Sequence, residues 1–182
     1  MDRFLEEVVV KKGRALEEIF FYISFVIMII AAILGMFEVS MFIQTITTGQ
    51  MYWLSLIFGL FQLGIAVLLF PYRDRLRTEY EYTFTNGVLD FAQVFNNNKR
   101  KSLGSLKINN VEAFGKVSSQ SFQRYISTPG IKQKRWFLNR GAELYYFYFV
   151  KDSNKNIIVL EPSEEMVSYI KQYLPFGAWQ EN

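Results

Sequence analysis

Two uninterrupted apolar stretches decide the architecture of the chain: IFFYISFVIMIIAAILGMF at residues 19–37 and YWLSLIFGLFQLGIAVLLF at residues 52–70. Neither stretch contains an acidic or basic side chain. At about 1.5 Å of rise per helical residue, each would be about 28 Å long, close to the ~30 Å hydrocarbon core of a bilayer. The sequence therefore predicts a transmembrane helical hairpin over residues 19–71, followed by a region of ordinary polarity.

Two other interpretations of these stretches fit less well. A cleaved signal sequence has an apolar region of only about 7 to 15 residues, and a second apolar stretch would not follow so soon. Buried helices of a soluble protein are the other alternative. Apolarity on all faces over this length favours lipid as the surroundings.

The charges beside the two stretches predict their orientation. Basic residues lie before the first stretch and after the second: Lys11, Lys12, Arg14, Arg73, Arg75 and Arg77. The connection at residues 38–51 contains no Lys or Arg. Because basic residues concentrate on the cytoplasmic side, we expect a multi-pass protein of the cell (cytoplasmic) membrane with both termini in the cytoplasm. The short, semi-apolar connection is expected at the outer interface.

Small residues lie at matching spacings in the two stretches. Ala31 and Gly35 are about one helical turn apart in the first stretch, as are Ser55 and Gly59 in the second. Such residues let helices approach closely, so these four positions could form the contact between the helices, although small residues are also simply common in membrane helices. Only Gln62 is strongly polar at depth, so the hairpin is expected to be an anchor and not a transporter.

The chain contains no His and no Cys. This composition excludes imidazole acid–base catalysis, thiol nucleophiles, disulfides and almost every zinc or iron–sulfur site. The acidic residues form no shared catalytic motif, and no Gly-rich phosphate loop follows a strand. We therefore expect a protein that is not an enzyme and that binds no metal or cofactor.

Residues 1–18 form the predicted cytoplasmic segment ahead of the hairpin. Phe4, Leu5, Val8 and Val9 have helical spacing, and charged residues occupy the other faces. An interfacial amphipathic helix fits this pattern. A short helix that packs on the soluble domain fits it equally well.

The soluble region opens with a β-hairpin signal. Residues 79–85 (EYEYTFT) and 88–94 (VLDFAQV) alternate in polarity around Asn86-Gly87, a dipeptide preferred in type I′ turns. A two-residue turn sets the register of the strands and so predicts one buried face. The residues of that face are Tyr80, Tyr82, Phe84, Leu89 and Phe91.

Further strand candidates and one helix complete the predicted α+β fold. The strand candidates are residues 102–108, 111–116, 132–138, 143–150 and 156–160. The aromatic run at residues 145–149 is expected to fill both faces of a central strand. Met166, Val167, Ile170 and Leu174 have the spacing of an apolar helical stripe, which predicts a closing amphipathic helix before a tail at residues 176–182.

Residues 78–175 resemble bacterial pleckstrin-homology-like domains. The features that carry the resemblance are the hairpin at residues 82–87, the basic loop at residues 99–101, the step at residues 108–111 and the strand order before a final helix. The whole chain is similar to an uncharacterised family of small bacterial membrane proteins. The resemblance implies a β-sandwich or partly open barrel closed by the C-terminal helix, with a binding or scaffolding role. Phosphoinositide-binding members carry basic residues around the first hairpin loop, where this chain has Asn86-Gly87.

Lys99, Arg100 and Lys101 form the densest basic cluster of the chain. On a loop they could contact lipid phosphates or a partner, or remain solvated. We expect a membrane-anchored, non-catalytic binding or scaffold protein that presents its domain to a protein partner or to the inner leaflet. The alternative is an accessory subunit of a membrane complex, recognised through its transmembrane hairpin. The bilayer and a protein that the sequence does not identify are the expected partners, and nucleic acid is not.

Overall fold

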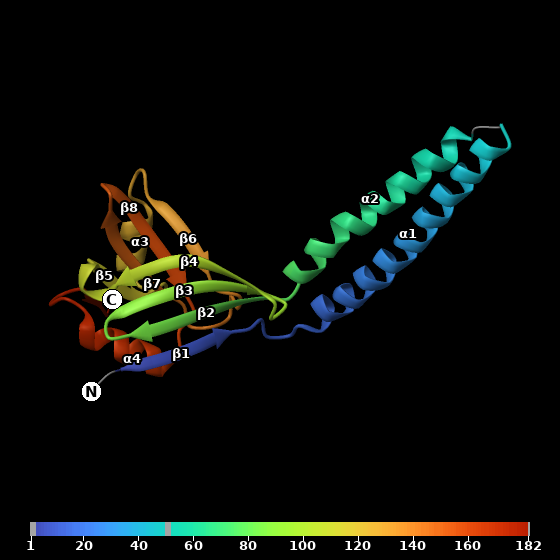
Figure 1. The fold of residues 1–182 in the computed structure, drawn as a ribbon. Coiled ribbons are helices and arrows are strands. Elements are labelled where there is room, and N and C mark those ends of the chain that lie inside the picture. Colours follow the sequence, from blue (N-terminus) through green and yellow to red (C-terminus); the bar gives the residue numbers. More distant parts are fainter. Residues whose placement is uncertain (1–2, 50–51, 182) are drawn as a thin grey trace. The chain divides into compact units, whose positions relative to one another are not determined.

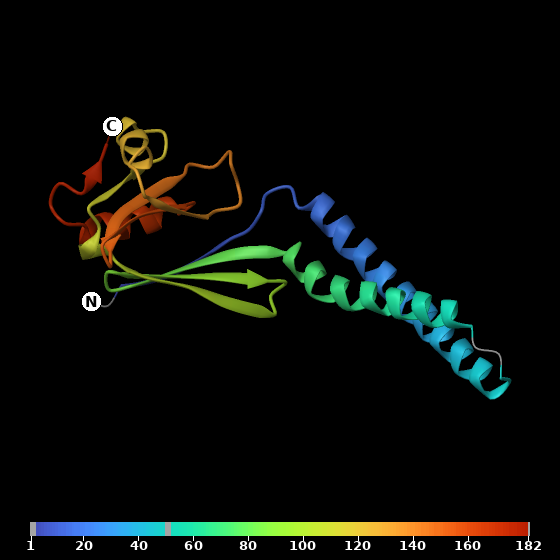
Figure 2. The same ribbon diagram turned by 90° about the horizontal axis from the view of Figure 1, so that it is seen from above.

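The computed structural model describes residues 3–49 and 52–181. The chain divides into two compact units. The hairpin unit holds residues 13–78 together with residues 95–97, and the β-unit holds residues 1–12, 79–94 and 98–182. Figures 1 and 2 show a pair of long helices in the first unit and two β-sheets with short helices in the second.

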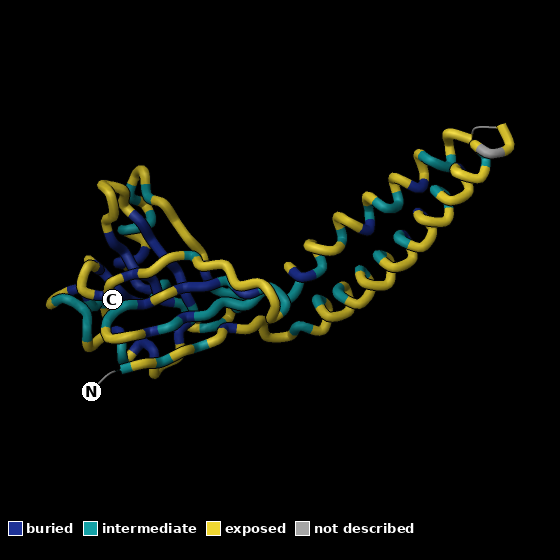
Figure 3. The backbone as a smooth tube through the Cα atoms, in the orientation of Figure 1, coloured by how far each residue is buried: buried dark blue, intermediate teal, exposed yellow. Residues whose placement is uncertain are grey.

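The hairpin unit consists of α1 (Ala15–Thr47) and α2 (Trp53–Arg75), which run side by side in opposite directions. Both helices are long and apolar enough to cross a membrane. Most of their large apolar residues are exposed. The burial colours of Figure 3 show exposed residues along both helices. An apolar surface of this extent has to be covered by something other than the hairpin itself, and lipid fits its composition.

The helix α1 is longer than the predicted first span. It continues through residues 38–47, which the sequence analysis assigned to the connection between the spans, so most of that connection is helical. Its placement at the outer interface stays a prediction. No Pro or Gly interrupts this segment, and Gly49 with its φ of +76° lies just beyond the helix end. A glycine in the left-handed region is a common helix stop, which explains why the helix ends here and not at Glu38.

The β-unit is a sandwich of two sheets that do not close into a barrel. One sheet has the strand order β1-β2-β3-β4 and the other the order β6-β8-β7-β5-β9. The bounds are β1 Phe4–Val9, β2 Thr78–Thr85, β3 Val88–Phe95, β4 Lys99–Lys107, β5 Ala113–Lys116, β6 Lys132–Trp136, β7 Tyr145–Lys151, β8 Asn154–Leu160 and β9 Trp179–Gln180. The helices are the 3₁₀ turn η1 (Ile108–Asn110), α3 (Gln120–Ile126) and the closing helix α4 (Glu164–Tyr173).

The segment before the hairpin is a strand, so the expected N-terminal helix was wrong. The strand β1 pairs antiparallel with β2 along its whole length, from Phe4 opposite Thr85 to Val9 opposite Tyr80. The spacing of the apolar residues that suggested a helix also fits a strand, whose side chains alternate between two faces. Leu5 and Val9 lie on the face that packs against the core. The run of β-branched residues at Val8, Val9 and Val10 favours an extended backbone, and pairing with β2 stabilises it as a strand.

The pairing of β1 with β2 makes the helical hairpin an insertion within the β-unit. The expected domain at residues 78–175 is therefore incomplete, because its first strand lies before α1. The turn Asn86-Gly87 joins β2 to β3 and is the second connection of the first sheet. The first connection is the helical hairpin itself, with Lys11 and Lys12 on the strand side.

The predicted β2–β3 hairpin and its buried face are confirmed. Asn86 and Gly87 have φ values of +46° and +86°, as a type I′ turn requires. Tyr82, Phe84 and Leu89 are completely buried and Phe91 is 2% exposed, whereas Tyr80 at the end of the face is half-buried. The alternation of the two strands therefore identified the main core face of the first sheet.

The strand β7 separates two apolar clusters, as the aromatic run predicted. Tyr145, Phe147 and Phe149 belong to the main core, together with β2, β3 and α4. Tyr146 and Tyr148 lie on the other face with Phe122 of α3. The helix α3 was not predicted, because seven residues give too short a pattern; Ser119 caps it by accepting a hydrogen bond from the Phe122 N–H at 3.3 Å.

Replacing Gly87 with Ala should destabilise the protein. An alanine at this position would have to adopt an unfavourable positive φ, and its Cβ would lie 2.6 Å from Cδ1 of Tyr173. We expect a loss of at least about 1 kcal/mol in the free energy of unfolding, measured by thermal melting of the full chain in detergent. Gly141→Ala is the matched control, since a Cβ there meets nothing within 4 Å. Equal melting temperatures for the two variants would contradict this account of the turn.

A β-unit made continuous should fold without the helices. Val9 and Tyr80 are direct partners, so a short Gly-Ser linker can join Lys12 to Thr78 in place of the hairpin. A chain that starts at Thr78 lacks β1 and should be less stable by at least about 2 kcal/mol, because the burial of apolar side chains such as Val9 is lost. Urea denaturation monitored by tryptophan fluorescence measures the free energy of unfolding of the linked chain and of the chain that starts at Thr78. Equal stability would show that β1 is dispensable.

Candidate functional site

The two helices of the hairpin approach each other closely at a pair of glycines. A Cβ on Gly35 would lie 2.9 Å from the Gly59 carbonyl oxygen, and one on Gly59 would lie 3.0 Å from the Gly35 oxygen. Ala31 is 8% exposed on the same helix as Gly35, whereas Ser55 is only half-buried. Of the four small residues singled out in the sequence, the two glycines thus face each other directly.

Aromatic and cationic groups mark two levels along the hairpin. Near one end the rings of Phe42 and Trp53 lie 5.3 Å apart, and near the other the Arg73 guanidinium lies 5.2 Å from the ring centroid of Phe21. Trp53 and Arg73 are separated by about 30 Å along α2, at ~1.5 Å per residue. This spacing equals the thickness of a bilayer core, with a tryptophan and an arginine at the levels where membrane helices commonly carry them.

A polar cluster at the base of the hairpin holds the turn between β3 and β4. Asn96 donates from Nδ2 to Oδ1 of Asp74 at 3.1 Å and from its backbone N–H to the Arg77 carbonyl at 2.8 Å. The Arg77 guanidinium stacks 3.8 Å from the centroid of Phe21. The sequence analysis used Arg73 and Arg77 only to predict the orientation of the hairpin. It missed the cluster, because Asn96 comes close to Asp74 and Arg77 only in the folded chain.

The predicted basic cluster lies on a strand and not on a loop. Lys99, Arg100 and Lys101 are the first three residues of β4, and their expected loop placement was wrong. The turn is formed by Asn96 and Asn97, both with positive φ, just before them. All three side chains are exposed, and Arg100 forms an ion pair with Glu81 of β2 at 2.7 Å. The ion pair partly neutralises the cluster.

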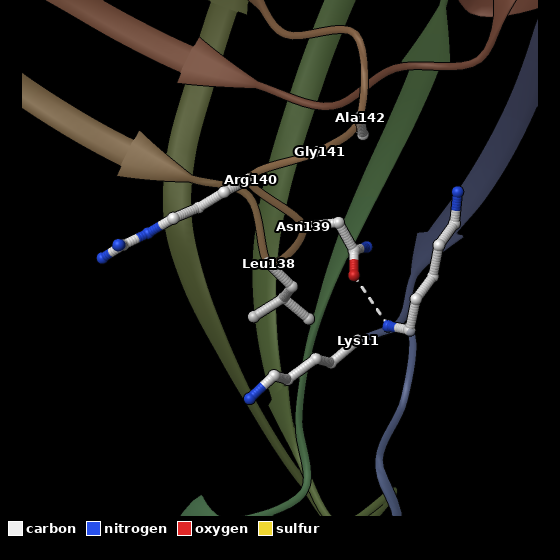
Figure 4. A pocket seen from close by; sticks show the side chains of 7 residues that line it. Lys11, Leu138, Asn139, Arg140, Gly141 and Ala142 are labelled. Atoms are coloured by element: carbon white, nitrogen blue, oxygen red, sulfur yellow. Dashed lines mark hydrogen bonds between the residues drawn. The ribbon is translucent and has the colours of Figure 1, made fainter.

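A second basic surface forms where the end of β1 meets the loop after β6. Lys11 and Lys12 line an open pocket of about 700 Å³ together with residues 138–142. Figure 4 shows the Lys11 and Arg140 side chains extending away from Asn139, which lies between the two segments. Three cations thus gather around one pocket. No sequence pattern indicated this surface, since its halves are more than a hundred residues apart.

Asn139 joins the two halves of this pocket. Its Oδ1 accepts a hydrogen bond from the Lys12 backbone N–H at 2.7 Å, and its Nδ2 donates to the Val10 carbonyl at 2.9 Å. The Asn139 N–H and Nδ2 also donate to the Glu161 carboxylate, at 3.0 and 2.8 Å. The asparagine therefore fixes the backbone that carries both lysines, while Glu161 is held by the same side chain.

Glu7 of β1 lies near Glu161, the carboxylate that Asn139 holds. Burial raises the pKa of Glu7, and the nearby carboxylates of Glu161 and Glu165 raise it further, although its hydrogen bond with Ser163 opposes the shift. The Glu7 carboxylate accepts that bond from the Ser163 N–H at 2.9 Å. Ser163 is the N-cap of α4, so β1 also fixes the start of the closing helix.

The fold and these surfaces define a class of protein: a pleckstrin-homology-like sandwich with two apolar helices inserted after its first strand. The chain belongs to the family described as Bacterial PH-like domain (DUF6106), whose family model matches residues 1–179. The match includes both β1 and the helical hairpin, so the insertion is part of the family pattern. Neither curated proteins nor solved structures gave a match.

The glycine contact can be tested with a bulky residue in its place. Gly59→Leu should force α1 and α2 apart, because a Cβ there already lies 2.9 Å from Cγ2 of Val39. Cysteines introduced for Phe42 and Trp53 allow a short thiol-reactive cross-linker to report the separation in membranes, since the chain has no other Cys. The cross-linking yield should fall markedly.

Gly64→Leu is the matched control, because a Cβ at Gly64 meets nothing within 4 Å. Its cross-linking yield should equal that of the parent chain. A similar fall in both variants, or in neither, would contradict a helix contact centred on Gly35 and Gly59.

Proposed function

We propose that the protein is a membrane-anchored, non-catalytic binding protein whose PH-like domain works at the cytoplasmic surface of the cell membrane. The observation that carries this proposal is the topology: the helical hairpin is inserted between β1 and β2, so both of its ends are fixed to one sheet. An anchor attached through two covalent connections restricts a domain more than a single flexible tether does. The domain is therefore kept beside the bilayer in a limited set of orientations.

The basic pocket is the surface proposed to contact the inner leaflet. Lys11 and Lys12 lie within four residues of the start of α1, so chain continuity keeps them close to the headgroups. Lys11, Lys12 and Arg140 together would contribute at most about 3 kcal/mol on an anionic surface, at ~1 kcal/mol per charge. That is enough to orient a domain that is already anchored, and too little to recruit a free one.

Membrane topology is tested first with a thiol probe that does not cross the membrane. A cysteine in place of Thr48, at the exposed end of α1, should be labelled in intact cells. Cysteines in place of Lys11 or Asn154 should be labelled only after permeabilisation. Labelling of the Asn154 variant in intact cells would overturn the cytoplasmic placement of the domain.

Leaflet contact is tested with the full chain in lipid nanodiscs. Amide hydrogen exchange of residues 138–142 should be slower in discs with anionic lipid than in neutral discs, and the difference should vanish at high salt. Replacing Lys11, Lys12 and Arg140 with Gln should abolish the difference. The control replaces Lys99, Arg100 and Lys101 with Gln and should leave it unchanged. A difference that persists at high salt, or that depends only on the control residues, would contradict the proposal.

A further inference from the structure

A groove lined by apolar side chains runs between the two helices of the hairpin. Its volume is about 420 Å³. Met28 and Ala32 of α1 form part of one wall, and Leu63, Val67 and Phe70 of α2 form part of the other. Val67 is 71% exposed, so the groove is open to the surroundings of the helices. In a bilayer those surroundings are acyl chains.

The groove leads directly to the polar cluster at the base of the hairpin. Phe70 lines the groove, and its ring centroid lies 5.5 Å from the Arg73 guanidinium. Ala66, Phe70 and Arg73 follow one another at intervals of four and three residues, so they share one face of α2. On α1, Phe25 lies one turn before Ile29 of the groove, and its ring centroid is 5.2 Å from the same guanidinium. The apolar walls and the cation therefore form one continuous surface.

One aromatic ring holds two arginines of this cluster. The centroid of Phe21 lies 5.2 Å from the Arg73 guanidinium and 3.8 Å from that of Arg77. A guanidinium over a ring uses its flat face for the contact, and its N–H donors point outward from the edge. Phe21 thus keeps two like charges close together without using their hydrogen-bond donors.

The cluster offers these donors few acceptors. Arg73 forms only a long ion pair with Oδ1 of Asp74, at 3.5 Å, and Nη1 of Arg77 lies 3.4 Å from Oδ1 of Asn96. Strong charge-assisted hydrogen bonds are about 2.7–2.9 Å long. The Nε atoms of both arginines are buried and have no hydrogen-bond partner among the described residues. Two guanidiniums beside one carboxylate also leave one positive charge uncompensated, so the cluster is suited to an added anion.

We propose that the hairpin binds one anionic phospholipid, with its phosphodiester at Arg73 and Arg77 and one acyl chain in the groove. The phosphodiester carries a single negative charge, which matches the single uncompensated positive charge of the cluster. A headgroup without a cation of its own, such as that of phosphatidylglycerol, leaves the phosphate free for the arginines. The site requires that the hairpin lies in a bilayer, but it does not depend on contact between the basic pocket and the leaflet.

Charge and depth select a phospholipid over another occupant of the groove. Lipid tails are as apolar as leucine side chains, so the groove supplies a shape for a tail but little net affinity. Arg73 lies about 30 Å along α2 from Trp53, one hydrocarbon thickness away, which is the level of the phosphates in a bilayer. A phospholipid brings an anion to that level, whereas an apolar helix of another protein brings none.

The test titrates the full chain with phosphatidylglycerol in a maltoside detergent and counts bound lipid by native mass spectrometry. The affinity should fall at least about tenfold in Arg73→Gln, because a hydrogen bond to a charged group is worth roughly that factor. Arg75→Gln is the matched control, since Arg75 is exposed at the same end of α2, and it should bind as the parent chain does. Equal losses in the two variants would reduce the effect to general positive charge and overturn the proposal.

The groove is tested with a second pair of variants, which keep both arginines and so remain informative if Arg73→Gln unfolds. Ala32→Leu fills the groove from α1 and should lower the affinity for phosphatidylglycerol. Gly64→Leu adds the same side chain where a Cβ meets nothing within 4 Å, and its affinity should equal that of the parent. An unchanged affinity in Ala32→Leu would overturn the placement of the acyl chain.

Competitors identify the occupant. Phosphatidylcholine should bind more weakly than phosphatidylglycerol, because its own ammonium group neutralises the phosphate, and millimolar inorganic phosphate should not displace the bound lipid. Equal binding of the two lipids would leave only a non-selective groove, and displacement by inorganic phosphate would assign the arginines to a free anion. A dimer of the parent chain that Ala32→Leu abolishes would assign the groove to a second copy. Each of these three results would overturn the proposal.

Discussion

The pairing of β1 with β2 is the constraint on which the rest of the structure depends. Six consecutive residues, Phe4–Val9, pair with a strand that begins only after both long helices. The entropic cost of closing a flexible loop grows with its length, but a preformed antiparallel helix pair brings its two ends together in advance. The contact of Gly35 with Gly59 thus supports the sheet as well as the hairpin. In the natural chain an assembled hairpin therefore lowers the cost of completing the β-unit, as a short linker in its place should also do.

The strand β1 also organises elements that are distant in sequence. The Arg3 N–H donates to Oδ1 of Asn86 at 2.8 Å, which fixes the β2–β3 turn, and its guanidinium lies 5.5 Å from the ring centroid of Tyr169 in α4. Glu7 accepts from the N-cap of the same helix. A burial that raises the pKa of this carboxyl is tolerated because the Ser163 N–H stabilises its charged form. The first strand therefore links the sheet, the turn and the closing helix.

Local patterns predicted the parts of this fold that local interactions determine. The type I′ turn at Asn86-Gly87 sets the register of β2 and β3 by itself, so alternation identified Tyr82, Phe84 and Leu89 as core residues. The spacing of Phe4 to Val9 fits a helix and a strand alike, and the partner that decides between them comes after the hairpin. The basic pocket was missed for the same reason, because its halves are far apart in sequence and Asn139 joins them in the folded chain.

The surfaces of the β-unit divide between charge and strand pairing. Lys11 and Lys12 lie within four residues of the start of α1, so two basic side chains stand where the first strand leads into the helical hairpin. The strand β5 pairs with β9 through Phe114 and Gly115, and its charged residue, Lys116, forms an ion pair with Glu143. A free edge of that kind could pair with other chains, and a segment of the same chain covers it, with Ala178 buried and Trp179 packed against the main core. The second sheet thus protects its two ends in different ways: β6 carries exposed basic side chains, whereas β5 is covered by a strand of its own chain.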